Sequence, residues 1–145
     1  MTHSLLLTAT LLLHITIAEA QVEKIFFQTY NIGDGTRRIT IQSNDAVELR
    51  SWNGAQMMIE TTSRLEGGNM DLLGILIKDG RYNFDFEHSG EDIVLHARLS
   101  VRPKIKHLDQ VCRETVKVLI YVPADFVILN QNELIRRDLL ATKNE

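Results

Sequence analysis

The sequence predicts a mainly β protein, a β-sandwich or a short β-solenoid-like stack of antiparallel strands, with a short helix near 69–79 and a possible C-terminal helix. Apolar and polar side chains alternate with period two through most of residues 36–130, as in strands that bury one face. The chain has 145 residues, of which 44% are hydrophobic and 24% charged, and these values fit one ordinary globular core.

The first 20 residues have the pattern of an export signal. The apolar run 5–18 is shorter than the roughly 20 residues that a bilayer core requires, and Ala18-Glu19-Ala20 gives a small-x-small cleavage pattern before Gln21. We expect cleavage between Ala20 and Gln21, leaving 21–145 as a single β-rich domain in the periplasm or at the cell surface of a bacterium. No Lys or Arg precedes Lys24, so a buried N-terminal helix and an uncleaved membrane anchor stay open as alternatives.

Charge and cysteine content argue against nucleic-acid binding and against a catalytic thiol. The net charge of −3 gives no basic footprint for a nucleic acid. A single cysteine, Cys112, cannot form an internal disulfide, so packing must hold the fold. Arg113 and His107 lie near it in sequence, but we expect a structural rather than a catalytic thiol.

The first predicted strands lie on either side of a break at Asn44-Asp45. Residues 36–43 form a half-buried strand, and Val47 and Leu49 form the next apolar row. Asn53-Gly54 is a turn signal. A three-residue loop keeps the apolar residues of both strands on one face, because it pairs Leu49 with Met57 and Val47 with Ile59. We therefore expect a bulged hairpin with Gly54 in a left-handed conformation.

A change of period predicts the helix near 69–79. Asn69 can cap it and Gly80 can close it, while Met70, Leu73, Leu76 and Ile77 share one face. Gly74 opposes this by about 1 kcal/mol relative to Ala, so a strand is the alternative.

Strand patterns return at 81–87 and 93–101, which predict an antiparallel hairpin with Val101 at the end of its inward row. Pro103 begins a surface connection that runs to Glu114. The pattern at 115–122 is the strongest strand, and its two apolar faces predict a central position. Pro123-Ala124-Asp125 turns the chain into a further strand at 126–129.

The C-terminal segment has the spacing of a helix. Asn130 and Glu133 fit a capping box before the apolar residues Leu134, Ile135, Leu139 and Leu140. We expect this helix to pack on the sheet rather than to bind a membrane or a partner, since it is short and of mixed charge.

Two stretches resemble bacterial adhesin domains of unknown function, a β-rich family of the cell envelope. The first is 45–54 with Met57-Met-Ile-Glu60, and the second is Val116-Lys-Val-Leu-Ile-Tyr-Val-Pro123 with Phe126-Val-Ile. The resemblance covers about residues 36–130 and implies an envelope location and a structural or adhesive role, with no active site to transfer. The long Gly- and Asp-rich ladder common in that family is missing, which points to a short variant.

No residue pattern predicts a catalytic, cofactor or metal site. His88, His96 and His107 have no metal-ligand spacing. The acidic residues Asp85, Glu87, Glu91 and Asp92 could offer oxygen ligands to calcium, although a solvated turn is the preferred interpretation. Trp52 is the one candidate binding aromatic; we expect it to pack on its own sheet, with stacking on a sugar or a partner as the alternative.

These observations predict a non-enzymatic exported protein that contacts an envelope protein or a surface polymer, with no cofactor, no nucleic acid and no transmembrane span in the mature chain. The oligomeric state stays open. The alternative is a small periplasmic hydrolase or ligand-binding protein, which a deep pocket holding two or more of His96, His107, Cys112 and acidic side chains would favour. A periplasmic regulator is a third possibility.

Overall fold

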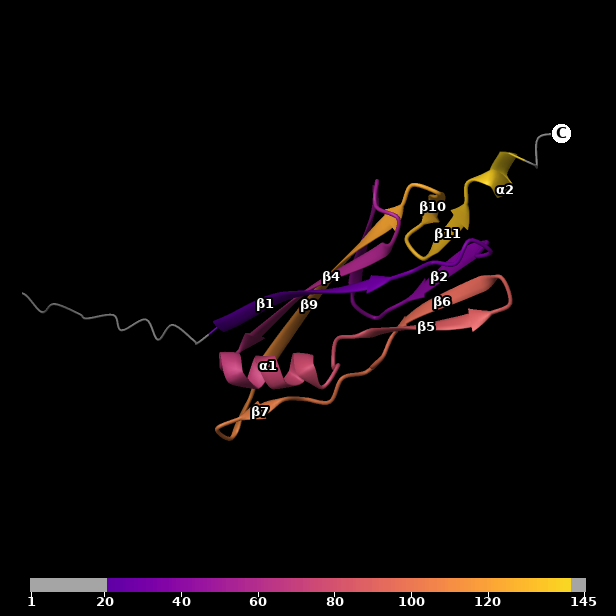
Figure 1. The fold of residues 1–145 in the computed structure, drawn as a ribbon. Helices are drawn as coiled ribbons and strands as arrows, with labels where there is room; N and C mark the ends of the chain where they lie inside the picture. Colours follow the sequence, from indigo (N-terminus) through magenta and orange to yellow (C-terminus); the bar gives the residue numbers. More distant parts are fainter. Residues whose placement is uncertain (1–20, 142–145) are drawn as a thin grey trace, which may run out of the picture.

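A computed structural model describes residues 21–141 as two large β-sheets that share one hydrophobic core (Figure 1). The predicted signal 1–20, with Ala20 at the cleavage position, lies outside the described residues, and Gln21 is the first residue of β1. No helix within residues 21–141 has both the length and the apolar character needed to cross a membrane.

The first sheet, sheet A, has the order β1-β4-β9-β3. Its strands are β1 (Gln21–Tyr30), β4 (Met57–Glu66), β9 (Arg113–Pro123) and β3 (Ala46–Trp52). The second, sheet B, has the order β10-β11-β2-β6-β5. It consists of β10 (Phe126–Asn130), β11 (Glu133–Arg136), β2 (Arg38–Gln42), β6 (Asp92–Ala97) and β5 (Phe84–Ser89).

Both sheets are mixed rather than purely antiparallel. β3 pairs with β9 in parallel and β2 pairs with β6 in parallel, whereas the remaining pairs within these sheets are antiparallel. The expectation of a stack of antiparallel strands is therefore wrong in these two places. Parallel neighbours require long connections, and both pairs join segments far apart in the chain.

The core lies between the two sheets and confirms the mainly β prediction. In β4 burial alternates without exception from Met57 to Glu66, as period two requires. The fully buried apolar residues of this core come from both sheets: Ile39, Met57, Ile59, Ile93, Leu95, Ile120, Val122, Phe126 and Leu134. The central position predicted for 115–122 is also confirmed, because β9 lies between β4 and β3.

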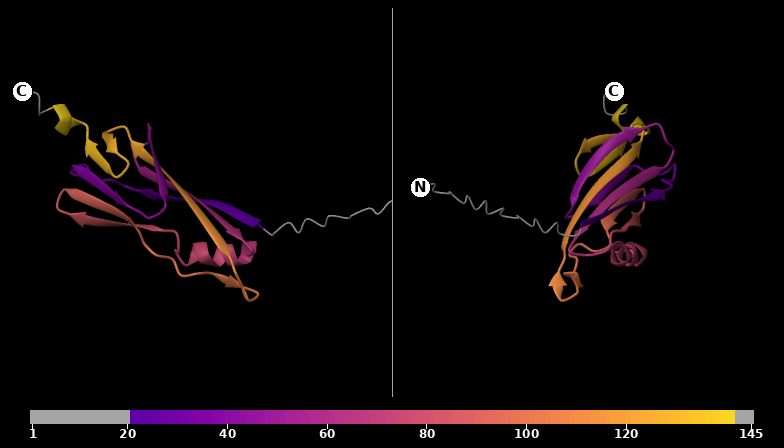
Figure 2. Two further views of the ribbon diagram at one scale, coloured as in Figure 1. Left: turned by 180° about the vertical axis from the view of Figure 1, so that it is seen from behind. Right: turned by 90° about the vertical axis from the view of Figure 1, so that its left-hand side faces the viewer.

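The helix predicted near 69–79 is confirmed as α1 (Met70–Lys78). The Asn69 side chain accepts a hydrogen bond from the Leu72 backbone N–H at 2.8 Å, and Leu73 is fully buried. Figure 2 shows α1 at one end of the molecule beside the start of β1. There a smaller apolar cluster, formed by Leu65, Ile105 and Cys112, packs against Val22, Leu72 and Leu76.

The connection after Pro103 holds a short hairpin, β7 (Lys106–His107) and β8 (Gln110–Val111). Its two-residue loop, Leu108 and Asp109, has positive φ angles of 48° and 62°. That combination is typical of a type I′ turn and usually needs Asn or Gly. Val101, expected to point inward, is 79% exposed, since β6 ends at Ala97.

The predicted hairpin of β3 with β4 is wrong. β9 lies between the two strands, so Leu49 pairs with Ile120 and Val47 with Val118. Gly54 is not among the glycines with positive φ. Alternation identified the inward face of each strand correctly. It did not identify the neighbour, because β3 and β4 bury the same faces equally well when each pairs with β9.

Two further boundaries differ from the predictions. The strand core begins at Gln21 instead of 36, because β1 was hidden by Lys24 and Gln28 on its inward side. The C-terminal helix is reduced to α2 (Asp138–Ala141), and residues 133–136 form β11. The Asn130 side chain accepts from the Asn132 backbone N–H at 2.8 Å, so it stabilises a turn between β10 and β11 rather than a helix.

Candidate interaction surface

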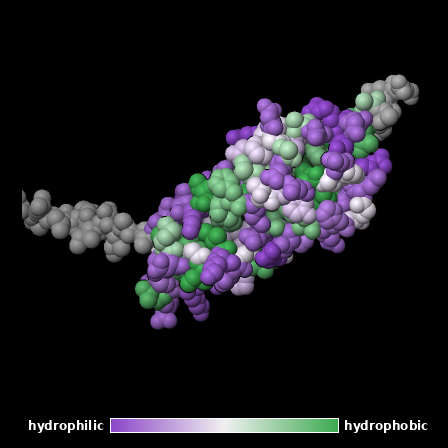
Figure 3. Space-filling view, viewed as in Figure 1, coloured by the Kyte–Doolittle hydropathy of each residue, from purple (hydrophilic) through white to green (hydrophobic). Residues whose placement is uncertain are grey.

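The outer face of sheet A carries a group of large apolar side chains. Period-two alternation turns them away from the core, and the register places them on neighbouring strands. We call this group the outer patch; it consists of Ile25, Phe27, Trp52, Met58, Leu119 and Tyr121. Ile25 is 51% exposed and Phe27 is 56% exposed, whereas the other four are half-buried. In the view of Figure 3, hydrophobic residues gather above β1 and at the end that carries α1 and β7.

Charged residues border the outer patch, and one of them, Glu60, lies within it, between Phe27 of β1 and Leu119 of β9 in the register. Glu23 accepts from Arg64 with an N–O distance of 2.8 Å, and Glu48 accepts from Arg50 at 2.7 Å. Glu60 accepts a hydrogen bond from the Tyr121 hydroxyl at 3.2 Å. The Tyr121 hydroxyl thus partners the carboxylate that lies among the apolar side chains, and aromatic residues with such a polar group are common in protein interfaces.

Trp52 packs on its own turn, as the preferred interpretation expected. Its indole N–H donates to the Gln56 carbonyl at 3.0 Å, and its ring centroid lies 5.8 Å from that of Tyr121. A Cβ atom at Gly54 would lie 2.2 Å from the indole, so glycine is needed there for close approach. Trp52 as a whole is half-buried, so part of it contributes to the outer patch.

A chain of alternating charges is buried near the junction of the two apolar clusters. Arg102 donates two hydrogen bonds to Asp45, Arg81 donates to both oxygens of Glu114 at 2.8 and 3.1 Å, and Arg102 lies 3.6 Å from Glu114. These four side chains are between 10% and 17% exposed. They connect four separate segments, which period-two analysis of single segments could not detect.

The buried network controls the protonation of the groups inside it. Burial acts to raise the pKa of Glu114, but the hydrogen bonds from Arg81 and the positive charges of Arg81 and Arg102 outweigh burial and leave the pKa below its usual value. Burial raises the pKa of Asp45, in spite of its pairing with Arg102. Burial also raises the pKa of the Tyr82 hydroxyl to about 12. The four charged side chains are paired with one another, which suits a structural role.

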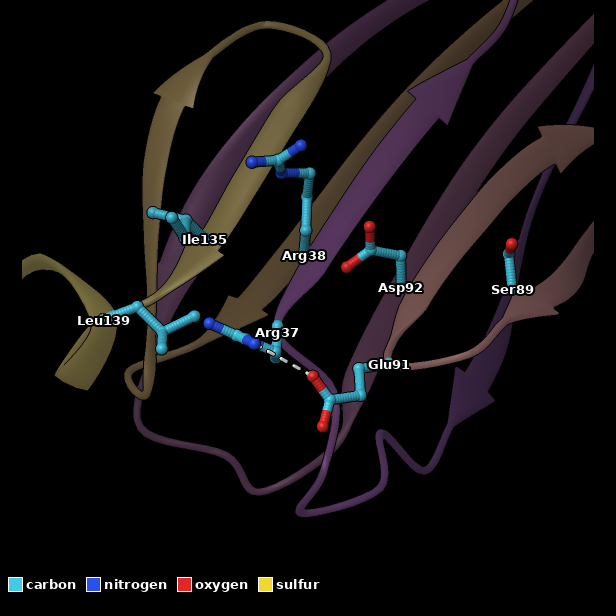
Figure 4. A pocket seen from close by; sticks show the side chains of 7 residues that line it. All are labelled: Arg37, Arg38, Ser89, Glu91, Asp92, Ile135 and Leu139. Carbon is cyan, nitrogen blue, oxygen red and sulfur yellow. Dashed lines mark hydrogen bonds and ion pairs between the residues drawn. The ribbon is translucent and has the colours of Figure 1, made fainter.

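An open groove of about 470 Å³ lies on the outer side of sheet B (Figure 4). Arg37 and Glu91 form an ion pair at 3.1 Å on its rim, and Ile135 and Leu139 line one side. Arg38 is paired with Glu133 at 3.2 Å. The Arg37–Glu91 pair is more than half exposed on both sides, so its electrostatic contribution is small.

The polar residues considered for a catalytic or metal site are dispersed. His88 hydrogen-bonds the Tyr30 hydroxyl at 2.9 Å, His96 lines an open groove together with Glu87, His107 belongs to β7, and Cys112 is buried. His96, His107 and Cys112 are not brought into one pocket. Within residues 21–141 no three His, Cys, Asp or Glu side chains are grouped to hold a metal ion.

The acidic residues around the β5–β6 hairpin are partly engaged in ion pairs. Asp85 accepts two hydrogen bonds from Arg98, at 2.9 and 2.6 Å, which lower the pKa of its carboxyl group. Glu91 is paired with Arg37. This pairing fits the solvated turn preferred over a calcium site.

Comparison of the chain with family models, with curated proteins and with solved structures found no match.

Proposed function

We propose that this chain is a non-enzymatic protein of the bacterial cell envelope, exported by its first 20 residues, that binds a protein partner through the outer patch of sheet A. The role is adhesin-like, in agreement with the resemblance of the 45–60 and 116–128 segments to envelope adhesin domains. The observation that carries the proposal is the exposure of Ile25 and Phe27 on the same sheet face as Met58, Tyr121 and Trp52.

Residue composition favours a protein over a polymer as the partner. Phe, Tyr, Trp, Met and Arg are the side chains enriched in protein interfaces, and the outer patch with its arginine rim contains all five. Fully burying Ile25 and Phe27 would each contribute up to about 1–2 kcal/mol, because about half of each side chain is already covered. Their neighbours are held in place by the sheet, so little conformational entropy is lost on binding.

Export and binding can be tested together in the bacterium of origin. We expect the native full-length chain to be recovered from the envelope fraction with an N-terminus at Gln21. Phe27→Glu should move the protein into the soluble fraction, since a carboxylate would be desolvated at the interface. Val101→Glu is the matched control, because Val101 is 79% exposed and lies outside the outer patch. Both variants should keep the wild-type melting temperature.

Protease treatment of envelopes from cells that lack this protein separates the two kinds of partner. Purified mature protein should sediment with untreated envelopes and fail to sediment with digested ones. Retained binding to digested envelopes would identify a surface polymer and overturn the protein partner. Equal release of the Phe27→Glu and Val101→Glu variants into the soluble fraction would overturn the outer patch as the binding site. A cytoplasmic protein with Met1 intact would overturn export.

A further inference from the structure

β3 is an edge strand whose second side pairs with nothing in the part of the chain that the structure describes. An unpaired edge offers backbone N–H and C=O groups to another strand. β3 is seven residues long and contains no Pro, Gly or bulge that would discourage such pairing. It is therefore a suitable edge for strand addition.

The other edges are protected. On β1, Lys24 lies on the inward side yet remains exposed, which discourages another strand from docking there. The Gln28 side chain donates to the Phe84 carbonyl at 3.3 Å and accepts from the Phe84 N–H at 2.9 Å, so it occupies the edge of β5. β10 is short and irregular between Ile128 and Asn130. The charges of β3, Glu48 and Arg50, lie only on its outward face, so within residues 21–141 it is the long edge without an inward charge, a side-chain cap or a bulge.

The sequence of β3 is complementary to itself when reversed. We propose that two copies of this chain pair through β3 in antiparallel orientation, with the two-fold axis at Leu49. Glu48 then lies opposite the Arg50 of the second copy, and Arg50 opposite its Glu48. Ala46 lies opposite Trp52, small against large. Each pair is on one face of the sheet, because these positions differ by an even number of residues.

The charges select this register over its neighbours. A shift by two residues keeps the inward and outward faces correct, so hydrophobic parity alone does not exclude it. One such shift places Glu48 opposite Glu48, and the other places Arg50 opposite Arg50. Like charges directly opposite are destabilising, whereas the register centred on Leu49 has two attractive pairs.

The paired arrangement is closed and symmetric. Both copies use the same strand, as in an isologous two-fold dimer, so no free β3 edge remains for further growth. The two four-stranded sheets become one continuous sheet, and the Leu49 side chains of both copies meet on the core side. The outer patches of the two copies then lie on the same outer surface.

Sedimentation equilibrium of the mature protein tests this pairing. Wild-type protein should be a dimer, and Glu48→Arg and Arg50→Glu should each weaken dimerisation about tenfold or more, because two attractive pairs become repulsive by symmetry. An equimolar mixture of the two variants should restore the dimer as a heterodimer, since the two arginines on β3 of one variant then face the two glutamates on β3 of the other. The ion pair of Glu48 with Arg50 inside one chain cannot produce this rescue.

Circular dichroism and melting temperature confirm that each variant is folded. Glu91→Arg is the control, because it removes an exposed ion pair on sheet B and should leave the dimer unchanged. A monomeric wild-type protein at its highest soluble concentration would overturn the proposal. A dimer that is insensitive to Glu48→Arg, or a mixture that fails to associate, would overturn the β3 site or its register. Phe27→Glu should leave the dimer intact, so this result is independent of the proposed partner binding.

Discussion

Glu114→Gln should strongly destabilise the protein, because it removes one charge from the buried network. Glu114 accepts two hydrogen bonds from Arg81, at 2.8 and 3.1 Å, and its side chain is only 16% exposed. The amide keeps the shape and one acceptor oxygen, but two buried arginines are then balanced by Asp45 alone. Breaking a buried pair costs about 3–5 kcal/mol, and the retained oxygen reduces the expected cost to about 2–4 kcal/mol.

Urea denaturation followed by circular dichroism measures this cost. The control is Glu91→Gln, whose partner Arg37 is 56% exposed, and it should cost at most about 0.5 kcal/mol. A loss of about 3 kcal/mol corresponds to a fall of roughly 10–15 °C in melting temperature for a domain of this size. Equal costs for the two variants would refute the assignment of a buried, paired carboxylate at position 114.

The pH dependence gives a second test with a defined sign. The pKa of Glu114 is lowered in the folded state, so its contribution to the free energy of unfolding is fully present above the usual value of 4.5 and is lost as the pH falls below it. The difference between wild type and Glu114→Gln should therefore narrow on acidification below pH 4.5. The raised pKa of Asp45 acts in the opposite direction. Its main cause, burial, is common to both proteins and cancels in the difference, whereas the smaller contribution from the charge of Glu114 is present only in the wild type.

Three further substitutions test local geometry. Gly54→Ala should displace the indole of Trp52, cost about 1–2 kcal/mol and shift the fluorescence of this sole tryptophan to longer wavelength; an unchanged spectrum would contradict the contact. Gly74→Ala should stabilise by about 0.5–1 kcal/mol in urea denaturation, because a Cβ there meets nothing within 4 Å and α1 gains a better helix former; destabilisation would contradict the helix. Asp109→Gly should raise the free energy of unfolding in urea by about 0.5–1 kcal/mol, since φ is 62° at Asp109 and 48° at Leu108, and a lower value would contradict the turn.

Much of the fold follows from patterns within single segments. Period two identified Ile39, Ile41 and Ile120 as inward residues, and capping residues placed α1 within one residue of its observed limits. Both signals depend on neighbours a few positions apart, so they can be seen in one sequence. β1 was missed because Lys24 and Gln28 interrupt its inward row, and the Gln28 side chain does so to hydrogen-bond the Phe84 backbone of β5.

The errors concern which strands and side chains contact one another, not which side of each strand is buried. Asn53-Gly54 suggested a hairpin, but Val47 and Leu49 satisfy their burial equally well beside β9. The buried Asp45–Arg102–Glu114–Arg81 network was also missed. In the sequence its members look like ordinary surface charges. They come from four segments that are far apart in the chain, so no local spacing predicts that they form ion pairs.

The outer patch was only partly accessible from sequence. Trp52 was identified by its place next to a turn signal, and its packing was expected correctly. Ile25 and Phe27 were not, because recognising them as outward requires knowing that β1 pairs with β4. Once that pairing is known, their exposure follows from the register with Thr62 and Glu60.

The place of β9 between β4 and β3 has a consequence for how the chain acquires its structure. Ala46 finds its hydrogen-bonding neighbour only at Lys117, and β2 likewise requires β6 and β11. Contacts of such long range close slowly, and a polypeptide emerging N-terminus first cannot complete either layer until its last quarter is free. A truncation before Arg113 should consequently yield an open, protease-sensitive chain rather than a smaller folded unit.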